Sequence, residues 1–176
     1  MRYMLKFFAY LLLVLFLVIF FLPKVNLYYK AEQILQNYKL TVSAEKLTDN
    51  GFSFKINDGV VYFDDLAVAK IGEISLTSLL FYNRIDVKPF SFSKDMQQFV
   101  PLRVDNLNIT YTIINPVNIS IAASGEFGSL KGDISLLDKN ISLLLKPSKT
   151  LLNKRVFWLR QMKKDSQGGY HYESAY

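Results

Sequence analysis

The chain has 176 residues, is 51% hydrophobic and 15% aromatic, and carries a formal net charge of +6. This length allows one domain with a hydrophobic core. The sequence has no cysteine and a single histidine, which excludes disulfides, thiol chemistry and metal sites built from several histidines. Its mean hydropathy of +0.15 is high for a soluble protein, and the excess is concentrated near the N-terminus.

The N-terminal region, residues 1–23, is predicted to be a membrane-spanning helix. Residues 7–22 form an apolar run that has no charged residue and no polar face. With residues 3–5 and a snorkelling Lys6, the run reaches about 20 residues, enough to cross a hydrocarbon core of roughly 30 Å. The residues expected inside the bilayer include Phe7, Leu11, Leu15, Ile19 and Leu22.

A cleaved signal peptide is the alternative interpretation, because Arg2 and Lys6 precede the apolar run. Residues 20–25 lack the small residues that a signal peptidase needs, so an uncleaved anchor is expected. Lysines flank both ends of the run, so charge alone does not decide its orientation. The short basic tail favours a cytoplasmic N-terminus, which places residues 24–176 outside the cytoplasm. A cysteine-free exported domain is typical of a bacterial periplasm, so the predicted location is the bacterial inner membrane, crossed once.

A short amphipathic helix is predicted directly after the anchor, over residues 24–38. Its apolar residues recur at helical spacing, and the residues between them are more polar. This segment is expected to lead from the membrane interface into the domain. The apolar positions are Leu27, Ala31, Ile34, Leu35 and Tyr38.

Residues 39–146 are predicted to form an antiparallel β domain. Apolar and polar residues alternate with a period of two, as in half-buried strands, and the phase changes near Asp105. Turn signals at a spacing of roughly 8–12 residues indicate a meander of strands without crossover helices. These signals are Asp49-Asn50-Gly51, Asn57-Asp58-Gly59, Asp64-Asp65, Asn115-Pro116, Ser124-Gly125 and Asp138-Lys139-Asn140.

The fold class predicted is therefore mainly β. A sheet with one apolar face must cover that face. It is expected either to curve into a taco-like half-barrel or to pair edge to edge with neighbours. Both arrangements leave a groove or an edge for a lipid, a peptide or a partner strand.

The C-terminal segment, residues 147–176, is distinguished by its charge. Residues 146–164 contain many lysines and arginines and no acidic residue, and residues 149–164 are predicted to form a basic amphipathic helix. This helix either caps the sheet or contacts anionic lipid headgroups or an acidic partner. Nucleic acid is not an expected partner, because an exported domain does not meet a genome. The residues proposed for the contact are Lys154, Arg155, Trp158, Arg160, Lys163 and Lys164, and a last short strand is expected around Tyr170 and Tyr172.

No catalytic, metal or cofactor site is predicted. The single histidine, His171, lies between two tyrosines, where an exposed strand residue is the ordinary explanation. Asp64 and Asp65 occupy a turn, where aspartate is favoured for local hydrogen bonding. The sequence has no phosphate-binding glycine loop and no nucleophile elbow, so an enzyme is not expected.

Three short segments carry a resemblance to a known family: P-K-V-N-L-Y-Y after the anchor, G-x-V-Y-F-D-D-L, and L-K-P-S-K followed by L-R-Q-M-K-K. The chain resembles the type II secretion system protein N family, which is similar in style to AsmA-like envelope proteins. The resemblance implies a bitopic inner-membrane protein with a periplasmic β domain, and no catalytic residues. It favours an accessory subunit of a secretion, pilus or flagellar assembly. The alternatives are a lipid-handling module and, least favoured, an envelope enzyme.

Overall fold

The computed structural model describes residues 2–43, 45–94, 96, 103–153, 157–166 and 168–176. The chain begins with helix α1 (Arg2–Phe21), and helix α2 (Lys24–Gln36) follows after Pro23. The described residues that follow are mostly in strands, up to a short helix α3 (Lys149–Asn153) and a 3-10 turn η2 (Phe157–Gln161). Both predicted N-terminal helices are therefore present.

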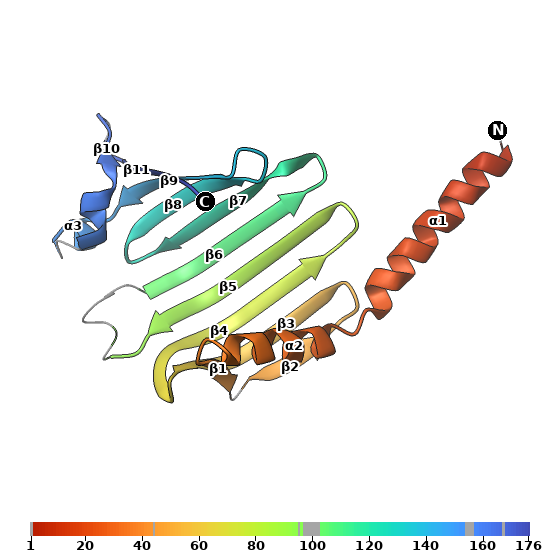
Figure 1. Ribbon diagram of the computed structural model, residues 1–176, viewed down its shortest axis with the longest axis horizontal. Coiled ribbons are helices and arrows are strands. Elements are labelled where there is room, and N and C mark those ends of the chain that lie inside the picture. Colours follow the sequence, from red (N-terminus) through yellow and green to blue (C-terminus); the bar gives the residue numbers. More distant parts are fainter. Residues whose placement is uncertain (1, 44, 95, 97–102, 154–156, 167) are drawn as a thin grey trace.

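The strands of the described residues form one antiparallel sheet that does not close on itself. They are β1 (Leu40–Ser43), β2 (Lys46–Asp49), β3 (Ser53–Phe63), β4 (Leu66–Ser78), β5 (Tyr82–Phe92), β6 (Arg103–Thr112), β7 (Asn115–Gly125), β8 (Gly128–Ser135), β9 (Asn140–Pro147), β10 (Lys163–Lys164) and β11 (Tyr170–Ala175). Their order is β1-β3-β4-β5-β6-β7-β8-β9-β11-β10, and β2 also pairs with β3 (Figure 1). The predicted mainly β meander, and its last strand, are confirmed.

The register of the sheet aligns apolar residues into rows that run across the strands. Because side chains alternate between the two faces of a strand, directly paired residues share a face. One row crosses from β3 to β11 through Ile56, Ile74, Val87, Leu107, Ala123, Leu130, Leu145 and Tyr170. A parallel row passes through Phe54, Leu76, Ile85, Ile109, Ile121, Gly132, Leu143 and Tyr172. We call the face that carries these two rows the inner face.

The alternation changes phase along one line that crosses four strands. In β4, Ala69 and Ile71 are buried on one side of Gly72, whereas Ile74 and Leu76 contribute to the inner face on the other. The line runs through Asp58 of β3, Gly72 of β4 and Pro89 of β5, which the registers of β3–β4 and β4–β5 skip. The register of β6 and β7 shifts between Val104 and Asn106, so the predicted phase change near Asp105 is confirmed.

The turn predicted at Asn57-Asp58-Gly59 is wrong. These residues lie inside β3, which continues to Phe63. Asp58 has a φ of 58°, a left-handed conformation that aspartate tolerates better than most residues. The local distortion is therefore absorbed within a continuous strand. Asp64 and Asp65 do form the turn between β3 and β4, and both have positive φ.

The single helix predicted over residues 149–164 is also wrong. The segment divides into α3, η2 and strand β10, which pairs with β11. Ser148 begins α3, because its Oγ accepts a hydrogen bond from the Leu151 amide at 3.1 Å. The helical spacing of the apolar residues was misleading, since the pairing of Lys163 and Lys164 with β11 replaces the last helical turn.

The described chain buries few large side chains. A cluster of Phe127, Leu145, Leu151 and Leu159 closes one corner of the inner face, beneath α3 and η2. Leu145 is 1% exposed and Leu151 is completely buried. This part of the C-terminal segment therefore caps the sheet, which is one of the two roles expected for it.

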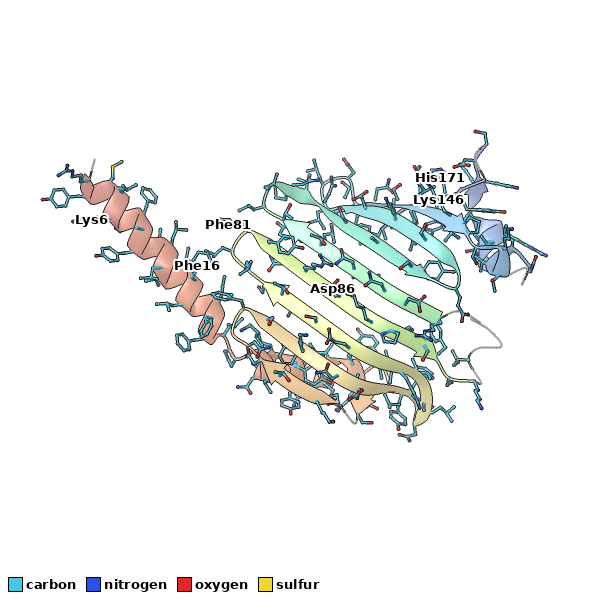
Figure 2. The ribbon with its side chains drawn as sticks, turned by 180° about the vertical axis from the view of Figure 1, so that it is seen from behind. Lys6, Phe16, Phe81, Asp86, Lys146 and His171 are labelled. Carbon is cyan, nitrogen blue, oxygen red and sulfur yellow. The ribbon has the colours of Figure 1, made fainter. Side chains whose placement is uncertain are left out.

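The opposite face, here called the outer face, is polar. Arg84 donates to both carboxylate oxygens of Asp86, at 2.7 and 2.8 Å, and Asn108 on the neighbouring strand donates to the same side chain at 3.0 Å. Figure 2 shows Asp86 on the face turned away from α2. The hydrogen bonds, first of all that from Arg84, hold the pKa of Asp86 below its ordinary value.

The lowered pKa gives a prediction about acid stability. Because its folded pKa is below its unfolded pKa of about 3.9, ionised Asp86 stabilises the fold above that pH. The contribution is lost as the pH falls through the folded pKa. Asp86→Asn is expected to flatten the loss of stability in acid, measured as denaturant midpoints from neutral pH to below about pH 4. The control is Asp133→Asn, an exposed carboxylate on β8. Identical pH dependence in Asp86→Asn and the wild type would contradict the prediction.

Candidate functional site

The inner face is covered unevenly. Helix α2 lies over β3 and its neighbours, and the rings of Tyr28 and Phe54 approach to 6.0 Å between centroids. At the other side of the sheet, α3 and η2 cover the corner that contains Leu145. In the described part of the chain, no helix lies over the middle strands (Figure 1). Leu107 and Ile109 on β6 are accordingly only half-buried.

A cavity of about 330 Å³ lies between α2 and strands β3, β4 and β5. This volume is at the lower end of the range for small-molecule sites. Its lining is apolar except for the polar groups of Lys24, Tyr28 and Ser78. The remaining lining residues are Leu22, Leu27, Ala31, Phe54, Ile56, Ile74, Leu76 and Ile85. We call this cavity and the uncovered inner face beside it the groove.

The polar groups at the groove are engaged with other protein groups. Tyr28 donates a hydrogen bond to Glu45 at 3.2 Å. Burial and the neighbouring Glu45 carboxylate raise the pKa of the Tyr28 phenol above its ordinary value, so the hydroxyl stays neutral and keeps donating. The groove therefore offers an apolar surface to a ligand and little free polar chemistry.

Lys24 joins the anchor helix to the β domain. It is 4% exposed, and its Nζ lies 3.2 Å from the Ile19 carbonyl, 3.3 Å from the Leu22 carbonyl and 3.5 Å from Asp49 Oδ1. Both carbonyls lie at the C-terminal end of α1, where the cation complements the negative end of the helix dipole. Asp49 also accepts the amide of Gly51 at 2.9 Å.

Aromatic packing joins the same two parts. The ring of Phe52, in the turn between β2 and β3, lies 6.0 Å from that of Phe16 and 5.2 Å from that of Phe20 on α1. Gly51 beside it has a φ of 76°, and a Cβ there would collide with the Phe20 ring. The C-terminal half of α1 is therefore in direct contact with the end of the sheet.

The residues predicted to lie in the bilayer are all at the N-terminal end of the molecule, outside the sheet. Phe7, Leu11, Leu15 and Leu22 are exposed, Ile19 is half-buried, and no described residue of α1 is buried. This helix is long and apolar enough to cross a membrane. An apolar helix that is exposed along most of its length is consistent with lipid contact.

The basic residues predicted to contact lipid are not brought together on one helix. Lys154 and Arg155 lie outside the described residues, and of Trp158 only the backbone, in η2, is described. Arg160 is exposed on η2, and Lys163 and Lys164 are exposed on β10. These elements lie at the end of the strands far from α1 (Figure 1). Contact of this segment with anionic headgroups or an acidic partner stays a prediction.

A small polar depression accompanies β10 and β11. It is lined by Gln161, Lys163, His171, Tyr172 and Glu173. His171 Nε2 lies 3.1 Å from Asp165 Oδ2, at the turn that joins the two strands. Among the described residues, no group of His, Asp and Glu side chains could hold a metal ion. His171 thus has a local role in this hairpin.

The groove was not predicted residue by residue. The sequence identified an amphipathic helix and a sheet with one apolar face, but not that Ala31 and Leu22 would face Ile74. In the sequence, Lys24 is only one of several charged residues that flank the apolar run. A lysine directly after an apolar run and a proline is nevertheless a signal for capping of the preceding helix.

Comparisons of the chain with protein-family models, with curated proteins and with solved structures give no match. The features of the molecule that bear on its function are therefore α1, the groove and the contacts between them.

Proposed function

We propose that the chain is a single-pass inner-membrane protein whose periplasmic β domain binds lipid acyl chains in the groove, with the N-terminus in the cytoplasm. The observation that carries this proposal is the position of Leu22. It belongs to the apolar run of the anchor, and it lines the cavity beneath α2. A bilayer hydrocarbon chain and the groove therefore meet at one continuous apolar surface.

The energetics of the inner face support an apolar ligand. Its two apolar rows cross eight strands, yet only the two sides are covered by helices. Exposed apolar surface costs about 25 cal/mol for each Å², so a ligand that covers the middle strands stabilises the domain. Lipid is the apolar molecule available beside the anchor. The role does not require a cofactor, a metal or catalysis.

Filling the cavity tests the proposal. Ala31 lines the cavity but is itself exposed on α2, so Ala31→Trp is expected to occupy the space of an acyl chain without disturbing a core contact. Full-length protein purified in mild detergent is expected to carry phospholipid, detected by extraction and mass spectrometry. Ala31→Trp is expected to reduce it severalfold.

Gln33→Trp is the matched control, because Gln33 is exposed on the same helix and does not line the cavity. It is expected to retain the wild-type amount of phospholipid. Wild-type protein without bound phospholipid, or an equal loss in both variants, would refute acyl-chain binding in the groove.

A second candidate function is an accessory subunit of an envelope assembly, of the type II secretion, pilus or flagellar kind. The open sheet favours it, since β1 and β10 end the sheet order without closing it. The two-residue β10 consists of lysines, which discourage strand addition, so β1 is the better edge for a partner strand. Purification in mild detergent should then recover stoichiometric partner proteins, and recovery of the chain alone would count against this function.

A further inference from the structure

Four hairpin turns gather at the end of the sheet that adjoins α1. Because the strands form a meander, every second turn lies at the same end, and these are the turns β2–β3, β4–β5, β6–β7 and β8–β9 (Figure 1). Backbone hydrogen bonds connect each turn region to the next. They run from Ser78 to Phe52, from Ile113 to Phe81 and from Leu136 to Val117, at 2.9, 3.1 and 2.7 Å. We call these turns the anchor-side tips.

Three of the four anchor-side tips carry exposed apolar residues, which is unusual for turns, whereas the first tip is the polar Asp49-Asn50-Gly51 followed by Phe52. Phe81 is 51% exposed, Ile114 is 93% exposed and Leu137 is 75% exposed. Each lies beside another apolar residue, namely Leu80, Ile113 and Leu136. The fourth turn also carries Asp138, which accepts a hydrogen bond from Ser135, and Lys139, whose long side chain can reach the headgroups.

The turns at the other end of the strands differ. The β3–β4 turn is Asp64-Asp65, and Glu126 lies in the β7–β8 turn and is exposed. Exposed large apolar side chains also occur at the far end, at Tyr38, Phe63 and Leu66. Among the described residues, however, the apolar pairs that lie wholly within hairpin turns, Ile113-Ile114 and Leu136-Leu137, are at the end beside the anchor. A general shortage of polar residues does not explain this asymmetry.

The contacts of α1 set the depth of the tips. The first tip meets α1 at Phe16 through Phe52, and Figure 2 shows Phe81 at this same end of the sheet. Phe16 precedes Leu22, the end of the apolar run, by about 9 Å along a helix that rises 1.5 Å per residue. An apolar surface held in the membrane interface is typically buried by about 5–10 Å. The tips and the interface are therefore at matching depths.

We propose that the anchor-side tips insert into the leaflet that faces the β domain and form a second contact with the phospholipid bilayer. The inference rests on the anchor part of the proposed function, because α1 fixes where the bilayer lies. It does not depend on lipid in the groove. The contact would hold the strands upright on the membrane and keep the mouth of the groove, at Leu22 and Lys24, against the hydrocarbon.

Spin labels on single cysteines test this arrangement, because the chain has no native cysteine. The full-length protein is reconstituted into vesicles of phosphatidylcholine and phosphatidylglycerol, with labels at Ile114→Cys and Leu137→Cys. Collision with oxygen, relative to a water-soluble nickel chelate, should be severalfold higher at both tips than at a control label. The control is Glu126→Cys in a far turn, and Leu11→Cys reports on the anchor. Circular dichroism checks that each labelled variant is folded.

The outcomes separate the two proposals. Tip labels as exposed to the nickel chelate as the Glu126→Cys label, with a deep Leu11→Cys label, would overturn tip insertion and leave the anchor intact. An aqueous Leu11→Cys label would overturn the anchor and tip insertion with it. A Glu126→Cys label as deep as the tip labels would overturn the assignment of the contact to this end of the sheet.

Discussion

Replacing Leu145 by alanine is expected to lower the free energy of unfolding by about 2–5 kcal/mol, the range for a large-to-small change in a packed core. Leu145 is 1% exposed and lies at the centre of the cluster with Phe127, Leu151 and Leu159. Because this cluster contains the two most completely buried large side chains of the described residues, the neighbouring groups have little freedom to close the void. Denaturant unfolding in detergent, followed by circular dichroism, measures the effect.

The control for Leu145→Ala is Leu152→Ala on α3. Leu152 is adjacent to the buried Leu151 but is itself exposed. Its replacement is expected to change stability by less than about 1 kcal/mol, since surface substitutions are usually mild. Equal effects of Leu145→Ala and Leu152→Ala would show that the C-terminal cluster does not stabilise the sheet.

The second large effect is expected at the joint between the anchor and the sheet. Asp49→Ala leaves the buried Lys24 ammonium without its carboxylate and removes the acceptor of the Gly51 amide. An uncompensated buried group typically costs about 1–3 kcal/mol, and more when it is charged. Lys24→Met leaves the Asp49 carboxylate without its cation, but this carboxylate is 28% exposed and still accepts the Gly51 amide, so the expected loss is smaller. Asp49→Ala should therefore destabilise the protein more than Lys24→Met does.

A double-mutant cycle tests this asymmetry, again by denaturant unfolding of the full-length protein. In the Lys24→Met background, Asp49→Ala should cost less than in the wild type, because no buried charge remains. The matched pair is Lys55–Glu73, at 3.2 Å but considerably more exposed. Glu73→Ala should cost no more than about 1 kcal/mol. A larger loss for Lys24→Met than for Asp49→Ala would contradict the assignment of Lys24 as a compensated buried charge.

The elements that local patterns determine could be predicted from the sequence. The apolar run of α1, the helical spacing of α2 and the alternation in β3 and β7 are all local signals. The Asp64-Asp65 turn and the phase change near Asp105 are also indicated by local sequence signals. The predictions that were wrong, the turn at residues 57–59 and the helix over residues 149–164, concern features that depend on long-range strand pairing. Asp58 stays within β3 because β4 continues to pair around it, and β10 exists because β11 pairs with it.

The candidate site was harder to predict than the fold. The sequence indicated a groove but could not place α2 over β3 to β5, since this depends on tertiary packing. The anchor-side tips had a sequence signal that was not used. Ile113-Ile114 and Leu136-Leu137 stand at turn positions, where exposed apolar pairs are unexpected for a solvated loop.

The register of the last strands has an electrostatic consequence. Lys163 and Lys164 pair with His171 and Tyr170, which in turn pair with Leu144 and Leu145, four and five residues from the start of β9. At roughly 3.3 Å per residue, these two cations stand about 13–17 Å along the strand from its anchor-side end. The Debye length is about 8 Å at physiological ionic strength, so the field of a lipid surface at that end is reduced severalfold before it reaches them. Lys163 and Lys164 are therefore only weakly attracted to their own membrane and stay available to an acidic partner.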